Sequence, residues 1–121
     1  MPESNTPGEN IKDIHMDIDE QVIEETVRRI LSVARPDRII LFGSAAFGRM
    51  TRDSDIDLLV LMEVPGNVRE ERVRIRQALR GMGYPFDIFV MSPERFEESK
   101  NVFGGLAFPA RKYGKVIYEA A

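Results

Sequence analysis

Apolar positions along the chain change between helical and strand-like spacing. Over residues 17–34 the spacing is helical, and Asp17 or Asp19 stands where a helix start is capped, with Pro36 just past the end. The main apolar stripe of this helix is Ile23, Val27, Ile30, Leu31 and Ala34. A weaker stripe on the neighbouring side is Val22, Thr26 and Val33. We interpret the two stripes as one wide buried face, with a partner surface as the less favoured alternative.

Four short apolar runs predict β-strands over residues 38–42, 55–62, 85–91 and 115–119. Helices are predicted over 44–50, over 68–82 after the Pro65-Gly66-Asn67 turn, and from Ser92-Pro93 onwards. Helices and strands therefore alternate along the chain. This order predicts an α/β (α+β) fold with a small mixed β-sheet of about four strands flanked by helices.

The domain organisation follows from composition. Residues 1–13 are polar, contain two prolines and a glycine, and predict a disordered leader; residues 14–121 predict a single domain. The N-terminus lacks the basic and then apolar pattern of a secretion signal, and no apolar run approaches the roughly 20 residues that span a membrane. We expect a cytoplasmic protein that does not contact a membrane.

Charge and residue usage exclude several classes of function. The formal net charge is −3, so no general basic field attracts nucleic acid, which is not an expected partner. The chain has no cysteine, which excludes disulfides, cysteine-ligated zinc and thiol catalysis. Its one histidine, His15, lies just past the polar leader and before the first predicted helix, which makes a histidine-based triad or a multi-histidine metal site unexpected.

Three aspartates stand in apolar strand surroundings. Asp55 and Asp57 lie two residues apart in the second predicted strand, so their side chains project from the same face. Strand interiors disfavour aspartate and adjacent carboxylates repel, and a divalent cation is the simplest compensation. Asp87 lies between Phe86 and Ile88 in the third strand and joins the other two if these strands pair. Such oxygen-only ligands suit Mg²⁺ or Mn²⁺.

Gly43-Ser44 stands where the first predicted strand ends and a short helix begins. Glycine allows backbone N–H groups to approach a phosphate closely, and the helix N-terminus adds favourable partial charge. The serine hydroxyl supplies one more donor. Alone, such a pair is more often only a tight turn. Together with the three aspartates it predicts phosphoryl or nucleotidyl transfer, in which positioning and charge neutralisation do most of the catalysis.

The spacing from Gly43 to Asp57 is Gly-Ser, ten residues, then Asp-Ile-Asp. It resembles the Gly-Ser-x10-Asp-x-Asp signature of the DNA polymerase beta-like nucleotidyltransferase superfamily. The segment LFGSAAFGRMTRDSDIDLLVLM is similar to the minimal nucleotidyltransferase branch of that superfamily. PFDIFVMSPERF resembles the segment that carries its third carboxylate, and the resemblance covers about residues 20–119.

The resemblance implies a nucleotidyltransferase fold and a role for each site residue. Asp55 and Asp57 are expected to bridge two Mg²⁺ ions, while Asp87 ligands one ion and helps to deprotonate the acceptor hydroxyl. ATP is the implied substrate. Many relatives carry arginines inside the glycine-rich loop, where this chain has Ala45 and Phe47, so the following Arg49 and Arg52 are the basic residues available. The expected nucleotide-binding residues are Gly43, Ser44, Arg49 and Ser54.

The resemblance also implies a partner. Family members of this size are similar to antitoxins of HEPN-domain toxin–antitoxin pairs, which transfer AMP from ATP to the toxin, commonly to a tyrosine. This chain has no Arg-x4-His motif of the HEPN type, so a HEPN-type partner is expected to be a separate protein.

Two other functions stay open. One is the same chemistry on a small molecule such as an aminoglycoside; such enzymes usually need an extra acceptor-binding domain, for which 121 residues leave little room. The other is a non-catalytic module that neutralises its partner by binding alone.

One further pattern is a row of arginines on the predicted helix 68–82. Its members are Arg69, Arg72, Arg76 and Arg80, and the only acidic residues of this helix are Glu70 and Glu71. A solvated helix face that covers its apolar flank is the slightly favoured interpretation. A surface that meets an acidic partner or RNA is the alternative.

Overall fold

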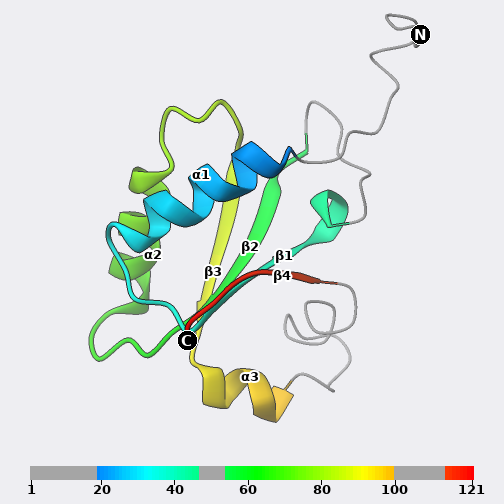
Figure 1. Ribbon diagram of the computed structural model, residues 1–121. Coiled ribbons are helices and arrows are strands. Elements are labelled where there is room, and N and C mark those ends of the chain that lie inside the picture. Colours follow the sequence, from blue (N-terminus) through cyan, green and yellow to red (C-terminus); the bar gives the residue numbers. More distant parts are fainter. Residues whose placement is uncertain (1–18, 47–53, 100–113) are drawn as a thin grey trace, which may run out of the picture.

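The apolar runs of the sequence form one mixed β-sheet with helices on both faces. The computed structural model describes residues 19–46, 54–99 and 114–121, and the statements that follow concern these residues. Its elements are α1 (Glu20–Leu31), β1 (Arg38–Phe42), the 3-10 helix η2 (Gly43–Ala45), β2 (Ile56–Leu61), α2 (Val68–Ala78), β3 (Phe86–Met91), α3 (Pro93–Ser99) and β4 (Lys115–Glu119) (Figure 1). The α/β fold with a small four-stranded sheet is confirmed. The predicted leader, residues 1–13, lies outside the described residues.

The sheet has the strand order β3-β2-β1-β4. β1 lies antiparallel to both β2 and β4, whereas β2 and β3 are parallel and are connected through α2. A parallel pair needs such a crossover connection, and the helix covers the sheet as it returns. The two central strands are therefore covered on both faces, which explains their nearly continuous apolar sequences, RIILF and IDLLVL.

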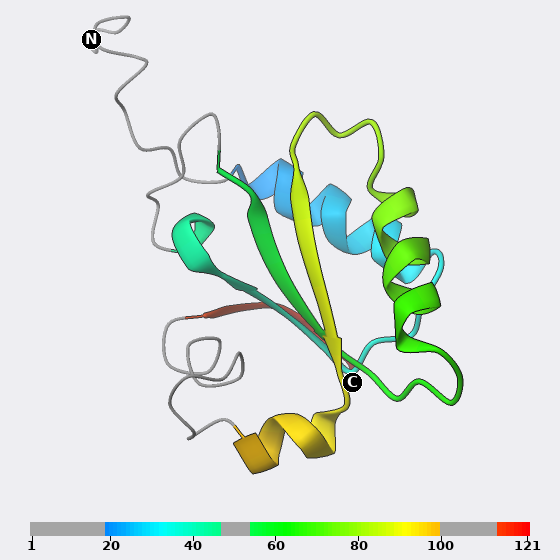
Figure 2. The same ribbon diagram turned by 180° about the vertical axis from the view of Figure 1, so that it is seen from behind.

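Apolar side chains from different helices cover the two faces. α1 and α2 lie together on one face, and α3 lies on the other, at the end of the sheet where β3 finishes (Figures 1 and 2). The larger core, under α1 and α2, contains Ile30, Ala34, Ile39, Leu41, Ala45, Ile56, Leu58, Val60, Met62, Ile75, Leu79 and Ile88. The smaller core, under α3, contains Ile40, Phe42, Leu59, Leu61 and Phe96.

The first helix is shorter than predicted, and its buried face is centred differently. Asp19 caps its start, because the Asp19 Oδ1 atom accepts a hydrogen bond from the Gln21 N–H at 2.8 Å. The helix ends at Leu31 instead of residue 34. Thr26, which the sequence placed on the weaker stripe, is buried and donates its hydroxyl hydrogen to the Val22 carbonyl oxygen at 2.7 Å. A wide buried face, as interpreted, accommodates both stripes.

The second helix also ends early, at Ala78 instead of residue 82. Gly81 and Gly83 follow with φ angles of +90° and +88°, which turn the chain towards β3. α1 holds this end of α2, because the Arg29 guanidinium donates to the Arg80 carbonyl oxygen at 2.8 Å and to the Ala78 carbonyl oxygen at 3.4 Å. The carbonyls at the end of α2 are thereby satisfied from a neighbouring helix.

Every helix in the described ranges is too short or too polar to cross a bilayer.

The start of α2 provides a test of this arrangement. The Asn67 side chain caps it and accepts hydrogen bonds from the Arg69 N–H at 2.8 Å and the Glu70 N–H at 3.2 Å. Asn67→Ala should lower the free energy of unfolding by about 1 kcal/mol, whereas Asn67→Asp should keep nearly the full value, because aspartate also caps well. Urea denaturation of the three proteins measures the difference. Equal losses in the two variants would contradict the capping role.

Candidate functional site

Two of the predicted site aspartates lie side by side where β2 and β3 begin. The parallel pairing places Asp57 in register with Asp87, and the antiparallel pairing places Phe42, the last residue of β1, on the other side of Asp57. Paired residues share a face of the sheet, and Phe42 belongs to the core under α3. The strand pairing on which the Asp87 prediction depended is therefore present. Both carboxylates lie on the sheet face opposite α1 and α2.

The third aspartate, Asp55, immediately precedes β2 and is exposed, whereas Asp57 and Asp87 are half-buried. The pKa of Asp57 is raised from 3.8 to about 6. Burial is the largest cause, followed by the negative charge of Asp87 and then that of Asp55. The negative charges of Asp87 and Asp55 thus add to the effect of burial on the Asp57 carboxylate.

Gly43 makes room for the Asp57 carboxylate. Gly43 follows β1 directly and begins η2 with a φ angle of +72°, in the left-handed region that favours glycine. A β-carbon added to Gly43 would collide with Asp57 Oδ2 and lie 3.1 Å from Asp57 Cγ. Both the backbone angle and the missing side chain are therefore needed. The role predicted for this glycine was a different one, the close approach of a phosphate.

Of the other predicted nucleotide-binding residues, Ser44 and Ser54 are described by the structure and Arg49 is not. Ser44 is half-buried within η2, a turn in which the Ala46 N–H donates to the Gly43 carbonyl oxygen at 3.1 Å. Ser54 is half-buried just before β2. Arg49 lies outside the described residues, as does most of the short helix predicted over 44–50.

The chemical type of the three aspartates suits a hard divalent cation better than their arrangement does. In the part of the chain that the structure describes, no group of three carboxylate or histidine side chains converges closely enough to hold a metal ion. Asp57 and Asp87 are register neighbours, and Asp55 is exposed at their rim. The donors are all carboxylate oxygens, and the raised pKa of Asp57 shows a negative charge that a cation would stabilise. The chemistry of the residues therefore fits a divalent cation, and Asp57 and Asp87 are the register neighbours that would hold it.

Sequence reasoning missed the aromatic wall beside these carboxylates. The rings of Phe42 and Phe89 meet with centroids 5.8 Å apart and planes tilted by 48°. Phe42 neighbours Asp57, and Phe89 lies two residues beyond Asp87 on the same strand face. The period-two spacing of Asp87 and Phe89 was the available signal. Both rings therefore lie on the same face of the sheet as Asp57 and Asp87.

The Gly43 packing can be separated into two effects by mutation. Gly43→Ala should destabilise the fold by more than Gly81→Ala, because Gly81 has a similar positive φ angle but no atom within 4 Å of an added β-carbon. Backbone strain alone costs about 1–2 kcal/mol, and overpacking adds about 1–3 kcal/mol. In an Asp57→Ala background, Gly43→Ala should retain only the strain component. Equal unfolding free energies for the two single glycine variants, measured in urea, would disprove the packing account.

The raised pKa of Asp57 predicts how the metal-free fold depends on pH. The pKa of Asp57 in the folded state, about 6, lies above the ordinary value of 3.8, so protonation of Asp57 favours the folded state. This stabilisation is complete below pH 3.8 and is lost as the pH rises through about 6. Asp57→Asn cannot ionise. In EDTA it should melt at a higher temperature than the unmodified protein at neutral pH, and the difference should vanish in acid. A difference in melting temperature that stays constant between neutral and acid pH would show that it does not come from the ionisation of Asp57.

Comparison with known proteins identifies the family of this chain. A family model described as a nucleotidyltransferase domain matches residues 20–112. No curated protein sequence gives a significant match. A crystal structure of a toxin–antitoxin with AMP-PNP is similar with a TM-score of 0.63 and 19% identity, over 81% of this chain and 73% of that chain. A second structure, of a protein from Sulfolobus solfataricus proposed to be a nucleotidyltransferase, gives a TM-score of 0.56 and 20% identity, over 82% and 78% of the two chains.

These structural likenesses concern the fold, and the family match covers most of the sequence, from the start of α1 past the end of α3. The match also spans Gly43 and the three aspartates. The chain belongs to the nucleotidyltransferase domain family and is a nucleotidyltransferase.

Proposed function

We propose that this nucleotidyltransferase transfers AMP from ATP to a hydroxyl group of a separate partner protein, with Mg²⁺ or Mn²⁺ as its cofactor. The observation that carries the proposal is the pair of register neighbours Asp57 and Asp87 beside the Gly43 turn. A strand-end turn for phosphates next to adjacent carboxylates provides the two requirements of the reaction, which are positioning and control of negative charge.

The transfer step balances as follows. The acceptor hydroxyl oxygen attacks the α-phosphorus of ATP and forms a new P–O bond. The bond between the α-phosphorus and the oxygen that bridges to the β-phosphorus breaks, and pyrophosphate leaves. The hydroxyl proton passes to the Asp87 carboxylate and then to solvent. The product is a phosphodiester between AMP and the partner.

Each site residue has a defined task in this step. Gly43 and Ser44 hold the phosphates at the turn after β1, and Asp87 receives the proton. Asp57 and Asp87, with Asp55, would hold the metal, which when bound supplies positive charge for the triphosphate and the leaving pyrophosphate. The Asp57 pKa of about 6 leaves this carboxylate mostly ionised at neutral pH, as a metal ligand must be.

The choice of acceptor rests on similarity. The crystal structure of a toxin–antitoxin with AMP-PNP, which is similar in fold, combines a protein pair with an ATP analogue. Together with the resemblance to minimal nucleotidyltransferases, this supports a protein acceptor, and we propose a HEPN-type toxin. In that pairing, this chain is the antitoxin and inactivates the toxin by attaching AMP.

Intact mass spectrometry tests the proposal. The protein is incubated with ATP, Mg²⁺ and a HEPN-type protein encoded beside it, and the partner should gain the mass of one or more AMP units. Asp57→Asn and Asp87→Asn should each slow the transfer by roughly a hundredfold or more, because metal charge stabilisation contributes several kcal/mol. Asp37→Asn, which changes an exposed aspartate outside the site, is the matched control and should leave the rate unchanged.

The other outcomes identify the alternatives. A stable complex without any mass shift, formed equally well by the aspartate variants, would replace this proposal with binding alone. Modification of an aminoglycoside, without any effect on the protein partner, would replace it with a small-molecule transferase.

A further inference from the structure

The arginines of α2 do not form one row. Arg76 and Arg80 line one hollow, Arg69 lines a neighbouring one, and the half-buried Arg72 lines neither. Among the residues described, Arg69, Arg76 and Arg80 have no acidic side chain within ion-pair distance, whereas Arg74 pairs with Glu71 at 3.4 Å. The predicted row is therefore divided between two hollows, and two of its arginines without an ion pair, Arg76 and Arg80, stand together at the end of α2.

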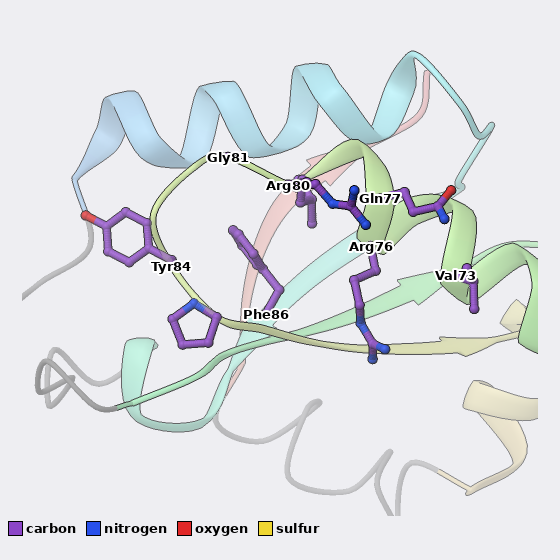
Figure 3. A pocket seen from close by; sticks show the side chains of 9 residues that line it. Val73, Arg76, Gln77, Arg80, Gly81, Tyr84 and Phe86 are labelled. Carbon is purple, nitrogen blue, oxygen red and sulfur yellow. The ribbon is translucent and has the colours of Figure 1, made fainter.

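The hollow beside Arg76 and Arg80, here called the α2–β3 pocket, has a volume of about 530 Å³. Its lining residues are Val73, Arg76, Gln77, Leu79, Arg80, Gly81, Tyr84, Pro85 and Phe86. Figure 3 shows the Arg76 side chain extending from α2 towards β3, with the Phe86 ring rising from the strand into the same space. Two cations thus stand at the rim of a largely apolar pocket.

The pocket is held in shape by the fold. The Arg29 guanidinium of α1 binds the Arg80 carbonyl oxygen at 2.8 Å, which fixes the end of α2. Tyr84 and Phe86 pack against the larger core and are half-buried. Val73 is 41% exposed and presents an aliphatic surface beside the cations. A ligand therefore meets a preorganised wall, and binding loses little free energy to ordering.

The pocket lies next to the candidate active site. Phe86 lines it and is followed by Asp87, whose side chain projects from the opposite face of the strand. β3 is an edge strand of the described sheet. A bound chain that continues past this edge reaches the carboxylate face within a few residues, at about 3.3 Å per extended residue.

We infer that the α2–β3 pocket binds an acidic segment of the acceptor protein through Arg76 and Arg80, with an apolar side chain of that segment against Val73 and Phe86. This inference rests on the proposed function and assigns to the site a docking surface for its substrate. Charge complementarity and the apolar lining are its two physical grounds. Docking there places the acceptor hydroxyl within reach of Asp87.

RNA fits these features less well than an acidic peptide. A nucleic acid strand needs a basic groove that follows its backbone and flat rings on which bases stack. Here the rings of Tyr84 and Phe86 are half-buried against the core, the exposed large apolar side chain of the pocket is the aliphatic Val73, and the protein carries a net charge of −3. A short acidic segment needs only the two local cations.

Fluorescence anisotropy with defined probes tests the inference on the full chain. The probes are a labelled peptide that alternates glutamate with leucine and tyrosine, the same peptide with glutamine in place of glutamate, and a single-stranded oligoribonucleotide of equal length. Arg76→Ala/Arg80→Ala removes the pocket cations. Arg28→Ala/Arg95→Ala, at exposed sites on α1 and α3, is the matched control, since each double variant changes the net charge from −3 to −5 by losing two arginines.

The acidic peptide should bind the unmodified protein, and the Kd should rise tenfold or more in Arg76→Ala/Arg80→Ala but less than twofold in the control. Val73→Ser should raise the Kd severalfold, and the glutamine peptide should bind at least tenfold more weakly than the acidic one. Equal losses in the two double variants, or no binding of the acidic peptide, would overturn the inference. Tighter binding of the oligoribonucleotide through the same arginines would replace the peptide with RNA.

A parallel titration with ATP and Mg²⁺ separates this inference from the proposed function. Arg76→Ala/Arg80→Ala should bind the nucleotide with an unchanged Kd, because the pocket lies on the other side of β3 from Asp57 and Asp87. If the nucleotide binds normally but the acidic peptide does not bind through Arg76 and Arg80, the proposed transferase site is retained and the docking surface is rejected. If nucleotide does not bind the unmodified protein, the proposed function fails regardless of the peptide.

Discussion

The fit of the Asp57 carboxylate against Gly43 is the contact on which the site depends. Only a residue without a β-carbon leaves space for this side chain, and the positive φ angle of Gly43 turns the chain out of β1 at the same point. The turn and the carboxylate are thus fixed relative to each other by packing. A phosphate held at the turn and a cation held by the carboxylate would then lie in a set geometry, which is what transfer at phosphorus requires.

The sheet supplies the rigidity that this arrangement needs. Asp57 is the second residue of β2, whose other residues are buried between a large core under α1 and α2 and a smaller core under α3. Placing adjacent carboxylates at the end of such a strand is unfavourable without a cation, as the raised Asp57 pKa shows. The stability of the two cores holds the carboxylates together despite their repulsion. A cation bound at these carboxylates would therefore add to the stability of the folded chain.

The order of helices and strands was predictable from the sequence because local patterns of apolar residues determine it. The strands follow from short apolar runs, whereas Asp55, predicted within the second strand, lies just before β2. The contact between Gly43 and Asp57 was not predictable, since it depends on the antiparallel register of β1 and β2, which no local pattern contains. The division of the α2 arginines likewise depends on how α2 lies over β3, and that is set by its packing against α1. The early end of α2 reflects the hydrogen bonds from Arg29 and the glycine turns that follow, which outweigh helical periodicity.

The central claim is that the nucleotide-bound metal sits on the carboxylate face beside Gly43. Paramagnetic broadening of amide NMR signals by Mn²⁺, in the presence of AMP-PNP, measures this position directly. The signals of Gly43, Asp57 and Asp87 should disappear first. Those of Thr26 in α1 and Ile75 in α2, on the opposite face of the sheet, should persist at the same Mn²⁺ concentration. Broadening that begins elsewhere, or that spreads evenly over both faces, would contradict it.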